Sequence, residues 1–231
     1  MTEQTVVINM MEHFEDEQLT FPIWLLADSL PSRWRDSLSG ALDPRFPTRH
    51  SIWTPVWDEI QATVYAPDKR RVDGERLCIC NAAPPLPDGE PDWDFDGLGI
   101  TGQIRDYGEA LHRYRPRIIL TFGQRAFEFA RRAIGLPSNK PKHWTCKNLG
   151  EEFRKRIDDF DPNEPNLFPL LHATIARGHW QQAHDDFTKT KGENYFKFAG
   201  GALGDLLKRH WDKCDVWVKI SAPSDARTSN N

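Results

Sequence analysis

The 231 residues of this chain are enough for one α/β domain with a single core, and we expect one domain over residues 1–231. A hydrophobic content of 39% beside 28% charged residues is ordinary for a soluble globular protein. The net charge of −4 excludes a protein coated in basic side chains, so any contact with nucleic acid has to be confined to a local groove.

Targeting and cross-linking signals favour a cytoplasmic protein. Residues 1–20 form a polar, acidic lead-in without the apolar segment of a secretory signal, and no stretch approaches the roughly 18 apolar residues of a membrane span. The four cysteines are Cys78, Cys80, Cys146 and Cys214. They form no C-x-x-C unit, so we expect free thiols and no zinc or iron–sulfur site. We therefore expect a soluble monomer without metal, cofactor or membrane partner, and with a flexible tail over residues 222–231.

The first half of the chain predicts two buried strands and a helix. The apolar run at residues 21–27 predicts a strand, which a polar turn with a proline ends. A long loop rich in Arg, Pro and Asp follows over residues 32–50, and Ser51 is the expected N-cap of a helix. The short apolar run at residues 77–80 predicts the second strand.

The second half alternates helices and strands. A helix is expected at residues 103–114 and a strand at residues 117–122. A strongly amphipathic helix follows at residues 124–134, then a strand at residues 167–171 and a last helix at residues 194–211. Four apolar strands separated by helical patterns predict a three-layer α/β/α fold around a central, mostly parallel four-stranded sheet.

Common nucleotide and hydrolase motifs do not occur where their function requires them. No G-x-G-x-x-G directly follows the first predicted strand, and the sequence holds no P-loop and no G-x-S-x-G elbow. Ser29, Asp28 and His172 can be combined into a hydrolytic triad, but Ser29 lacks the flanking glycines that expose such a nucleophile. Metal ligation by His172 with His179 and His184 is a weaker alternative, because their spacing matches no i, i+4 pair.

Three ordered segments carry a family resemblance. They are Trp24-Leu25-Leu26-Ala27-Asp28-Ser29-Leu30-Pro31, Leu77-Cys78-Ile79-Cys80-Asn81-Ala82 and Leu167-Phe168-Pro169-Leu170-Leu171-His172-Ala173. Together with the aromatic helix start at residues 51–56 and the strand at residues 117–123, the set resembles the uracil-DNA glycosylase superfamily over about residues 22–185. The resemblance implies an enzyme that flips a pyrimidine nucleotide out of DNA and hydrolyses its N-glycosidic bond, without a cofactor.

The resemblance also implies roles for single residues. Asp28 would position water or stabilise the cationic sugar, His172 would stabilise the departing base, and Asn81 would read the pyrimidine edge. The base would stack on Phe46 or Trp53. The DNA-binding residues would be Arg177, His179 and Trp180, as a wedge in the minor groove, and Lys140, Lys142 and Lys147, on phosphates.

Each residue also has an ordinary alternative. Asp28 and Asn81 are common turn residues, His172 fits a hydrogen-bonded strand end, Trp53 fits a core, and the lysines fit a solvated loop. Three whole-protein functions therefore stay open: a glycosylase, a catalytically silent DNA-binding protein on the same fold, and a hydrolase of small nucleoside-like substrates.

The substrate base is open as well. Ala173 and Thr174 follow His172 where the family has Pro and Ser, and no aromatic gate is visible beside Asp28. The excised base is then either uracil, in DNA repair, or a modified cytosine such as the glucosylated hydroxymethylcytosine of phage DNA, in antiviral defence.

Overall fold

A computed structural model describes residues 21–29, 54–83, 93, 95, 98–177 and 180–218. Its four strands are β1 (Ile23–Ser29), β2 (Leu77–Ala83), β3 (Ile118–Phe122) and β4 (Asn166–Leu170). Its helices are α2 (Thr54–Asp68), α3 (Leu98–Tyr114), α4 (Gln124–Ala133), α5 (Cys146–Asp158), α6 (Ala173–Arg177), α7 (Gln181–Thr188) and α8 (Tyr195–Arg209), with short 3-10 turns η3 (Gly74–Arg76) and η4 (Pro141–His143).

The strands form one parallel sheet in the order β2-β1-β3-β4. Ile23 pairs with both Leu77 and Ile118, so the three strands start level and run in the same direction. All residues of β3 and β4 are buried, as expected for continuous apolar runs in a parallel sheet covered on both faces. The predicted three-layer α/β/α fold is confirmed.

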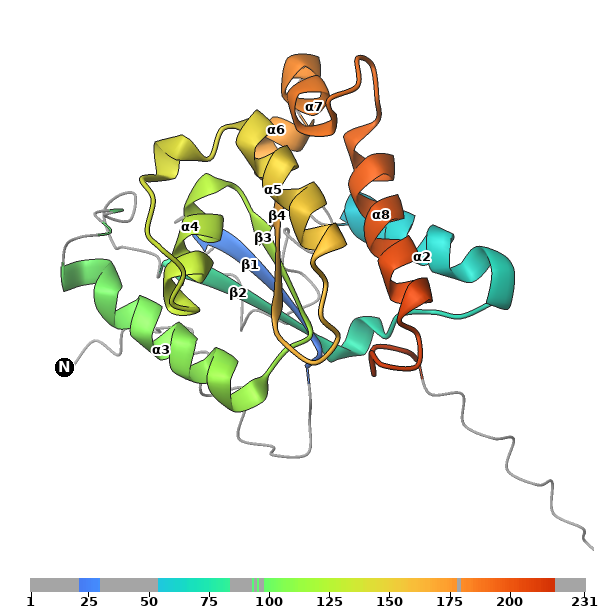
Figure 1. Cartoon of the computed structure of the whole chain (residues 1–231), viewed down its shortest axis with the longest axis horizontal. Helices are drawn as coiled ribbons and strands as arrows, with labels where there is room; N and C mark the ends of the chain where they lie inside the picture. The colour runs from blue at the N-terminus through green and yellow to red at the C-terminus, as the bar shows by residue number, and fades with distance from the viewer. Residues whose placement is uncertain are drawn as a thin grey trace, which may run out of the picture.

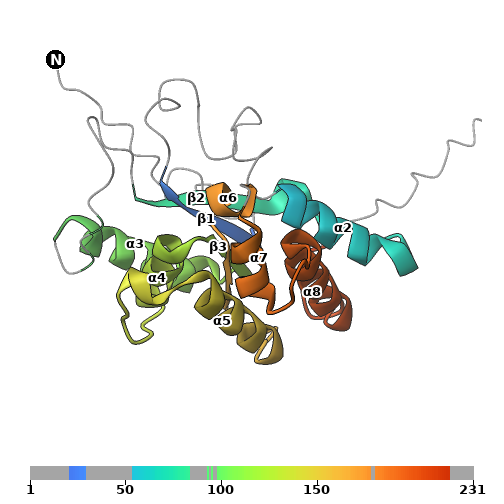
Figure 2. The ribbon, with the colours of Figure 1, turned by 90° about the horizontal axis from the view of Figure 1, so that it is seen from above.

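Helices cover both faces of this sheet (Figure 1). Figure 1 shows α3 and α4 on one side of the strands and α2 and α8 on the other, and the view from above in Figure 2 agrees. The Trp24 ring packs edge-on against Tyr107 of α3, with ring centres 5.7 Å apart. Because side chains alternate along a strand, Asp28 lies on the same face as Trp24, towards α3 and α4.

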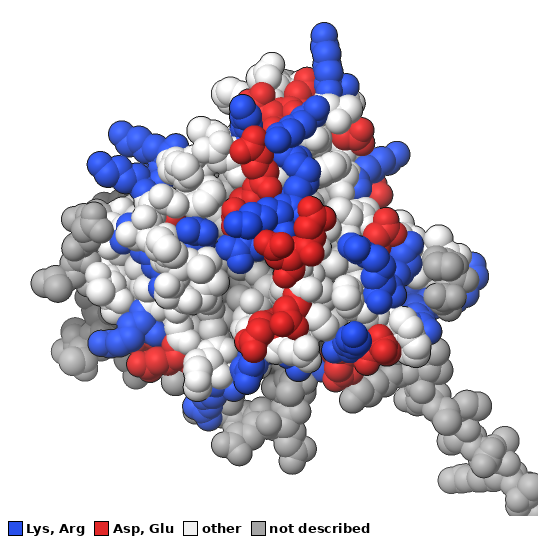
Figure 3. All heavy atoms as spheres, viewed as in Figure 1, with Lys and Arg blue, Asp and Glu red and all other residues white. Residues whose placement is uncertain are grey.

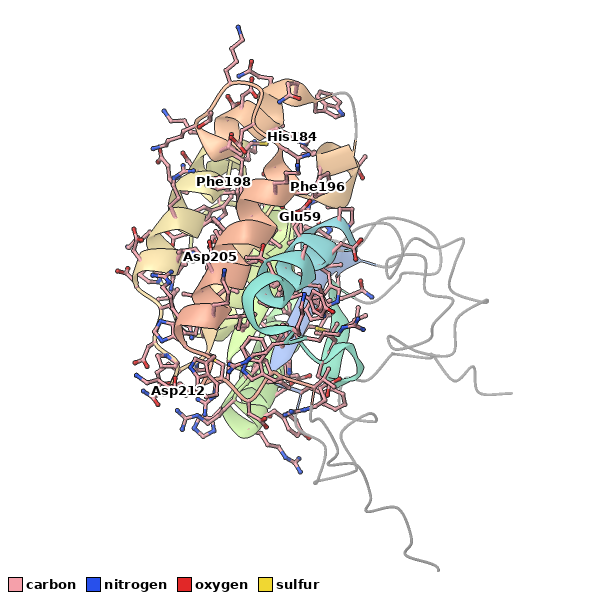
Figure 4. All side chains as sticks on the ribbon, turned by 90° about the vertical axis from the view of Figure 1, so that its right-hand side faces the viewer. Glu59, His184, Phe196, Phe198, Asp205 and Asp212 are labelled. Carbon is pink, nitrogen blue, oxygen red and sulfur yellow. The ribbon has the colours of Figure 1, made fainter. Side chains whose placement is uncertain are left out.

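Two glycines let α8 approach α2 closely. A Cβ atom at Gly200 would lie 2.6 Å from the carbonyl oxygen of Val56, and one at Gly204 would lie 2.6 Å from Cβ of Thr63. Any larger residue would force the helices apart. Figure 4 shows the two helices side by side, with Glu59 on α2 against α8.

Several predicted boundaries were wrong. Strand β1 continues through Ser29, so the expected polar turn does not begin at Asp28, and β2 continues past Asn81 to Ala83. Helix α3 starts five residues before residue 103, and the short helix α6, which the sequence did not predict, follows His172 directly. The expected N-cap Ser51 lies outside the described residues.

The remaining sequence expectations concern thiols and membranes. All four cysteines are free, and three of them are buried. None of the helices within the described ranges combines the length and the apolar character needed to span a bilayer.

Candidate functional site

Asp28 and His172 meet at Gly123, at the carboxyl-terminal edge of the sheet. Gly123 follows β3, the strand between β1 and β4, and its φ of 99° is one that residues with a side chain rarely adopt. A Cβ atom built on Gly123 would lie 3.1 Å from Cβ of His172 and 3.5 Å from Oδ1 of Asp28. The absence of a side chain there therefore lets the carboxyl and the imidazole flank one point.

Asp28 is held by the first turn of α4. Its Oδ1 accepts a hydrogen bond from the backbone N–H of Ala126 at 3.0 Å, where the positive end of the helix dipole favours an anion. Burial raises the pKa of Asp28 above its ordinary value, although protonated His172, the Ala126 N–H and Arg125 each lower it. The site therefore holds a carboxylate whose ionisation is opposed by its surroundings.

The backbone orients the ring of His172. Nδ1 accepts a hydrogen bond from the N–H of Thr174 at 3.2 Å, while the carbonyl of His172 accepts from Ile175 and Ala176 and so begins α6. A nitrogen that accepts a hydrogen bond carries no proton, so the neutral ring has its proton on Nε2. His172 thus presents an N–H donor.

Tyr195 of α8 anchors the end of β4. Its hydroxyl accepts a hydrogen bond from the N–H of Leu171 at 2.9 Å, directly before His172. Burial raises the pKa of Tyr195 well above its ordinary value, so the hydroxyl stays neutral. This contact fixes the backbone from which His172 projects.

Asn81 lies near this edge but on the other face of the sheet. It pairs with Ala27, so alternation places its side chain opposite to that of Asp28. The residue is partly exposed, and among the described residues no hydrogen-bond partner of its amide group is found. The side-chain NH2 and oxygen of Asn81 therefore form no hydrogen bond within the described part of the chain.

Arg125 and Trp93 are functional candidates that the sequence interpretation missed. Arg125 lies in the first turn of α4, its charge acts on Asp28, and its guanidinium carbon is 5.4 Å from the centre of the Trp93 ring. Trp93 in turn stacks on Phe95. The only sequence signal was the position of Arg125 two residues after Gly123, at a strand-to-helix turn.

The basic segment around η4 has a rigid core. Trp144 is buried and donates from Nε1 to Oε2 of the fully buried Glu128 at 2.8 Å, so it is a packing residue and not a free stacking surface. Lys140, Lys142 and Lys147 are exposed. Figure 1 places η4 and the first turn of α5 at the same end of the sheet as α6, and Figure 3 shows Lys and Arg side chains projecting over η4.

Of the remaining predicted site residues, the structure describes Trp180 and the backbone of Arg177. Trp180 precedes α7 and is 61% exposed, the largest exposed fraction among the large apolar side chains described. Arg177 is the last residue of α6, but the orientation of its side chain is not described. The other three predicted residues, Phe46, Trp53 and His179, lie outside the described part of the chain.

The metal site and the hydrolytic triad were the two alternatives that the sequence offered. His184 bonds through Nε2 to the carbonyl oxygen of Ala176 at 3.0 Å and packs against Tyr195 and Phe196. Figure 4 shows His184 near Phe196. In the parts of the chain that the structure describes, no three His, Cys, Asp or Glu side chains gather in a group that could hold a metal ion. Ser29 is the last residue of β1.

The arrangement combines a carboxylate, an imidazole N–H donor and an open backbone at one sheet edge. Such a set can stabilise a cationic centre on one side and a developing anion on the other. No protein-family model and no curated protein matches the chain.

Proposed function

We propose that this protein is a monofunctional DNA glycosylase, which flips a pyrimidine nucleotide out of the duplex and hydrolyses its N-glycosidic bond. The observation that carries the proposal is the convergence of Asp28 and His172 on Gly123. Ligands of parallel α/β sheets bind outside the carboxyl ends of the strands, which is where these residues lie.

In the proposed reaction the bond between the sugar C1′ and the base nitrogen breaks, and its electron pair leaves with the base. The Nε2–H of His172 donates a hydrogen bond to the base carbonyl on which the negative charge develops. Ionised Asp28 stabilises the positive charge on the sugar and orients the water that adds to C1′. The proton that this water releases neutralises the base, and the products are a free base and an abasic site.

Other residues would hold the nucleotide and the strand. Asn81 offers a donor and an acceptor with no partner among the described residues, and it would read the pyrimidine edge from the sheet face opposite to that of Asp28. Lys140, Lys142 and Lys147 would contact phosphates, and exposed Trp180 would fill the gap that the flipped base leaves. The base is either uracil, in repair, or a glucosylated hydroxymethylcytosine of phage DNA, in antiviral defence.

One observation favours a rival function. The hydrogen bond from Ala126 to Asp28 is the contact that a purely structural helix cap would make. A catalytically silent DNA-binding protein would keep Asp28 for this reason alone. It would bind DNA without releasing any base, and Asp28→Asn would leave its affinity unchanged.

The deciding experiment measures base release from matched duplexes. Purified protein is incubated with duplexes that contain uracil, glucosylated hydroxymethylcytosine or unmodified cytosine, and released bases are identified by mass spectrometry. We expect His172→Ala to lower the excision rate by about 10²–10³-fold and Asp28→Asn to lower it by at least as much. The control Lys155→Gln changes an exposed residue of α5 and keeps the wild-type rate.

The possible outcomes separate the functions. Abasic sites in neither modified duplex, with tight binding retained, contradict the glycosylase and leave the silent binder. Base release from free nucleosides but not from duplexes identifies a small-substrate hydrolase. A rate for Asp28→Asn equal to that of the wild type contradicts the assigned role of Asp28.

A further inference from the structure

A cluster of exposed and partly exposed aromatic and basic side chains lies far from the candidate site. We call it the aromatic corner and define it by Tyr65, Lys69, Arg70, Arg71, Trp211 and Trp217. We propose that the aromatic corner binds single-stranded nucleic acid, with bases stacked on its rings and phosphates held by its cations.

Exposed apolar surface is concentrated here. The described residues include four large apolar side chains that are exposed, and three of them, Tyr65, Trp211 and Val218, lie at this corner. Trp211 is 52% exposed and Tyr65 is 39% exposed. Large aromatic rings at the surface of a protein commonly mark a binding site, and a lone exposed residue does not.

Cations accompany each ring. The guanidinium carbon of Arg70 lies 4.0 Å from the centre of the Trp211 ring, and Nζ of Lys69 lies 4.8 Å from the centre of the Tyr65 ring. Arg71 lies 5.5 Å from the same tyrosine ring. Among the described residues, no carboxylate forms an ion pair with any of these three cations. Their charges are therefore available to a polyanion.

Charges of both signs surround the corner: Arg76, Lys208, Arg209 and Lys213 are accompanied by Asp73, Asp205, Asp212 and Asp215. Burial lowers the pKa of His210 below its ordinary value, and the charges of Arg209 and Lys213 lower it further, against an opposite effect of Asp212. The nearby Asp215 carboxylate is paired with Arg76 at 3.0 Å. In Figure 3, Lys and Arg side chains lie over the lower part of α8 with acidic side chains beside them.

The backbone beneath the corner is held firmly. The side chain of Gln61 exchanges two hydrogen bonds with the backbone of Val72, at 2.7 and 3.1 Å. Val72 also forms an antiparallel bridge with Trp217, whose Nε1 donates to the carbonyl of Trp211 at 2.8 Å. A preordered surface loses less conformational entropy when it binds a flexible strand.

The corner and the candidate site lie at opposite ends of the fold. Helix α2 leads from the carboxyl end of β1 to the amino end of β2, so its 15 residues separate the two by about 20 Å. In Figure 4, Asp212, which follows Trp211 in the chain, and His184 of α7 lie at opposite ends of the view. The aromatic corner is thus a second surface, and it does not depend on the proposed reaction.

The test is binding of full-length protein to a fluorescein-labelled oligothymidine of about 20 nucleotides, longer than the ~4–16 nucleotides that such sites span. Fluorescence anisotropy gives the Kd over a range of salt concentrations. Trp211→Ala should raise the Kd by about 5- to 100-fold. Arg70→Gln should reduce the slope of log Kd against log salt by about 0.7.

Two controls accompany these variants. Lys155→Gln removes an exposed charge on α5, and Lys191→Gln removes an exposed charge between α7 and α8; both should bind like the wild type. Thermal unfolding checks that Trp211→Ala folds, and quenching of tryptophan emission by the oligonucleotide should be smaller in that variant. The experiment measures binding alone, so its outcome for the aromatic corner does not depend on whether the protein excises bases.

Three results would overturn the proposal. In the first, the wild-type protein does not bind oligothymidine. In the second, Trp211→Ala and Arg70→Gln bind as tightly as Lys155→Gln. In the third, polyglutamate competes as well as the oligonucleotide and Trp211→Ala has no effect, which would assign the corner to acidic peptides.

Discussion

At the scale of single residues, Asp28 lies in a position where burial makes ionisation of its carboxyl group unfavourable. Burial raises the pKa of Asp28, although a helix N-terminus and two potential cations oppose this effect. A position chosen only for stability would favour an uncharged side chain. The retained carboxylate is therefore consistent with a function that requires it.

This cost predicts a pH-dependent gain in stability for Asp28→Asn. The unfolded carboxyl ionises near its ordinary pKa of 3.8 and the folded one at higher pH, so the wild type loses stability as the pH rises between the two values. The side-chain amide of Asp28→Asn carries no charge. Its oxygen can still accept the hydrogen bond from the N–H of Ala126. Each unit of raised pKa corresponds to about 1.4 kcal/mol, and each kcal/mol to about 2–4 °C in Tm.

Thermal unfolding as a function of pH checks this. The Tm of Asp28→Asn should exceed that of the wild type at neutral pH, and the difference should vanish as the pH approaches 3.8. Asp106→Asn, an exposed carboxylate of α3, serves as the control without this pH-dependent gain. A lower Tm for Asp28→Asn at neutral pH would show that the helix N-terminus outweighs burial.

At the scale of elements, close packing of α2 on α8 predicts opposite effects at adjacent glycines. A Cβ atom at Gly200 would lie 2.5 Å from Cβ of Glu59, whereas one at Gly201 meets nothing within 4 Å. Gly200→Ala should destabilise the protein by about 1–3 kcal/mol because the helices must separate. Gly201→Ala should stabilise it by up to about 1 kcal/mol through helix propensity alone.

Urea denaturation of the two variants measures both effects. They carry the same chemical change on neighbouring residues of one helix, so each is the control for the other. Equal effects of the two substitutions would mean that α2 and α8 are not in close contact at Gly200.

The sequence predicts those elements whose cause is local. Helix α4 is predicted because Gly123 and Gly135, both with positive φ, delimit an amphipathic run, and the strands are predicted because they are short apolar runs. Helix α7 is polar and escapes prediction. It is held by Phe187, which packs against Phe153 and Tyr195 from distant parts of the chain.

The residues of the candidate site, too, could be predicted only where the signal lies in the local sequence. Asp28 and His172 could be proposed from the sequence because each follows an apolar run at a strand end. The role of Arg125 could not, because it depends on α4 beginning beside β1. Nor could the face of Asn81, because that depends on the register between Ala27 and Asn81.

At the scale of the whole molecule, cations are grouped by location despite the net charge of −4. Acidic and basic side chains intermix over α5 in Figure 3, whereas Lys and Arg project over η4. The proposed duplex-binding lysines are Lys140, Lys142 and Lys147, at the end of the sheet that holds Asp28 and His172. A duplex bound there would displace counterions at that end only.

This grouping predicts which lysines determine duplex affinity. Replacing Lys140, Lys142 and Lys147 together by Gln should reduce the slope of log K against log salt by about 0.9 for each phosphate that the variant no longer neutralises. If the protein excises bases, KM should rise while kcat stays near the wild-type value, because phosphate contacts position the strand and take no part in bond breaking. A triple variant at exposed Lys155, Lys191 and Lys197 changes the net charge equally and is the matched control. Equal slopes for the two triple variants would show that duplex DNA responds to the total charge of the protein and not to a surface beside Asp28 and His172.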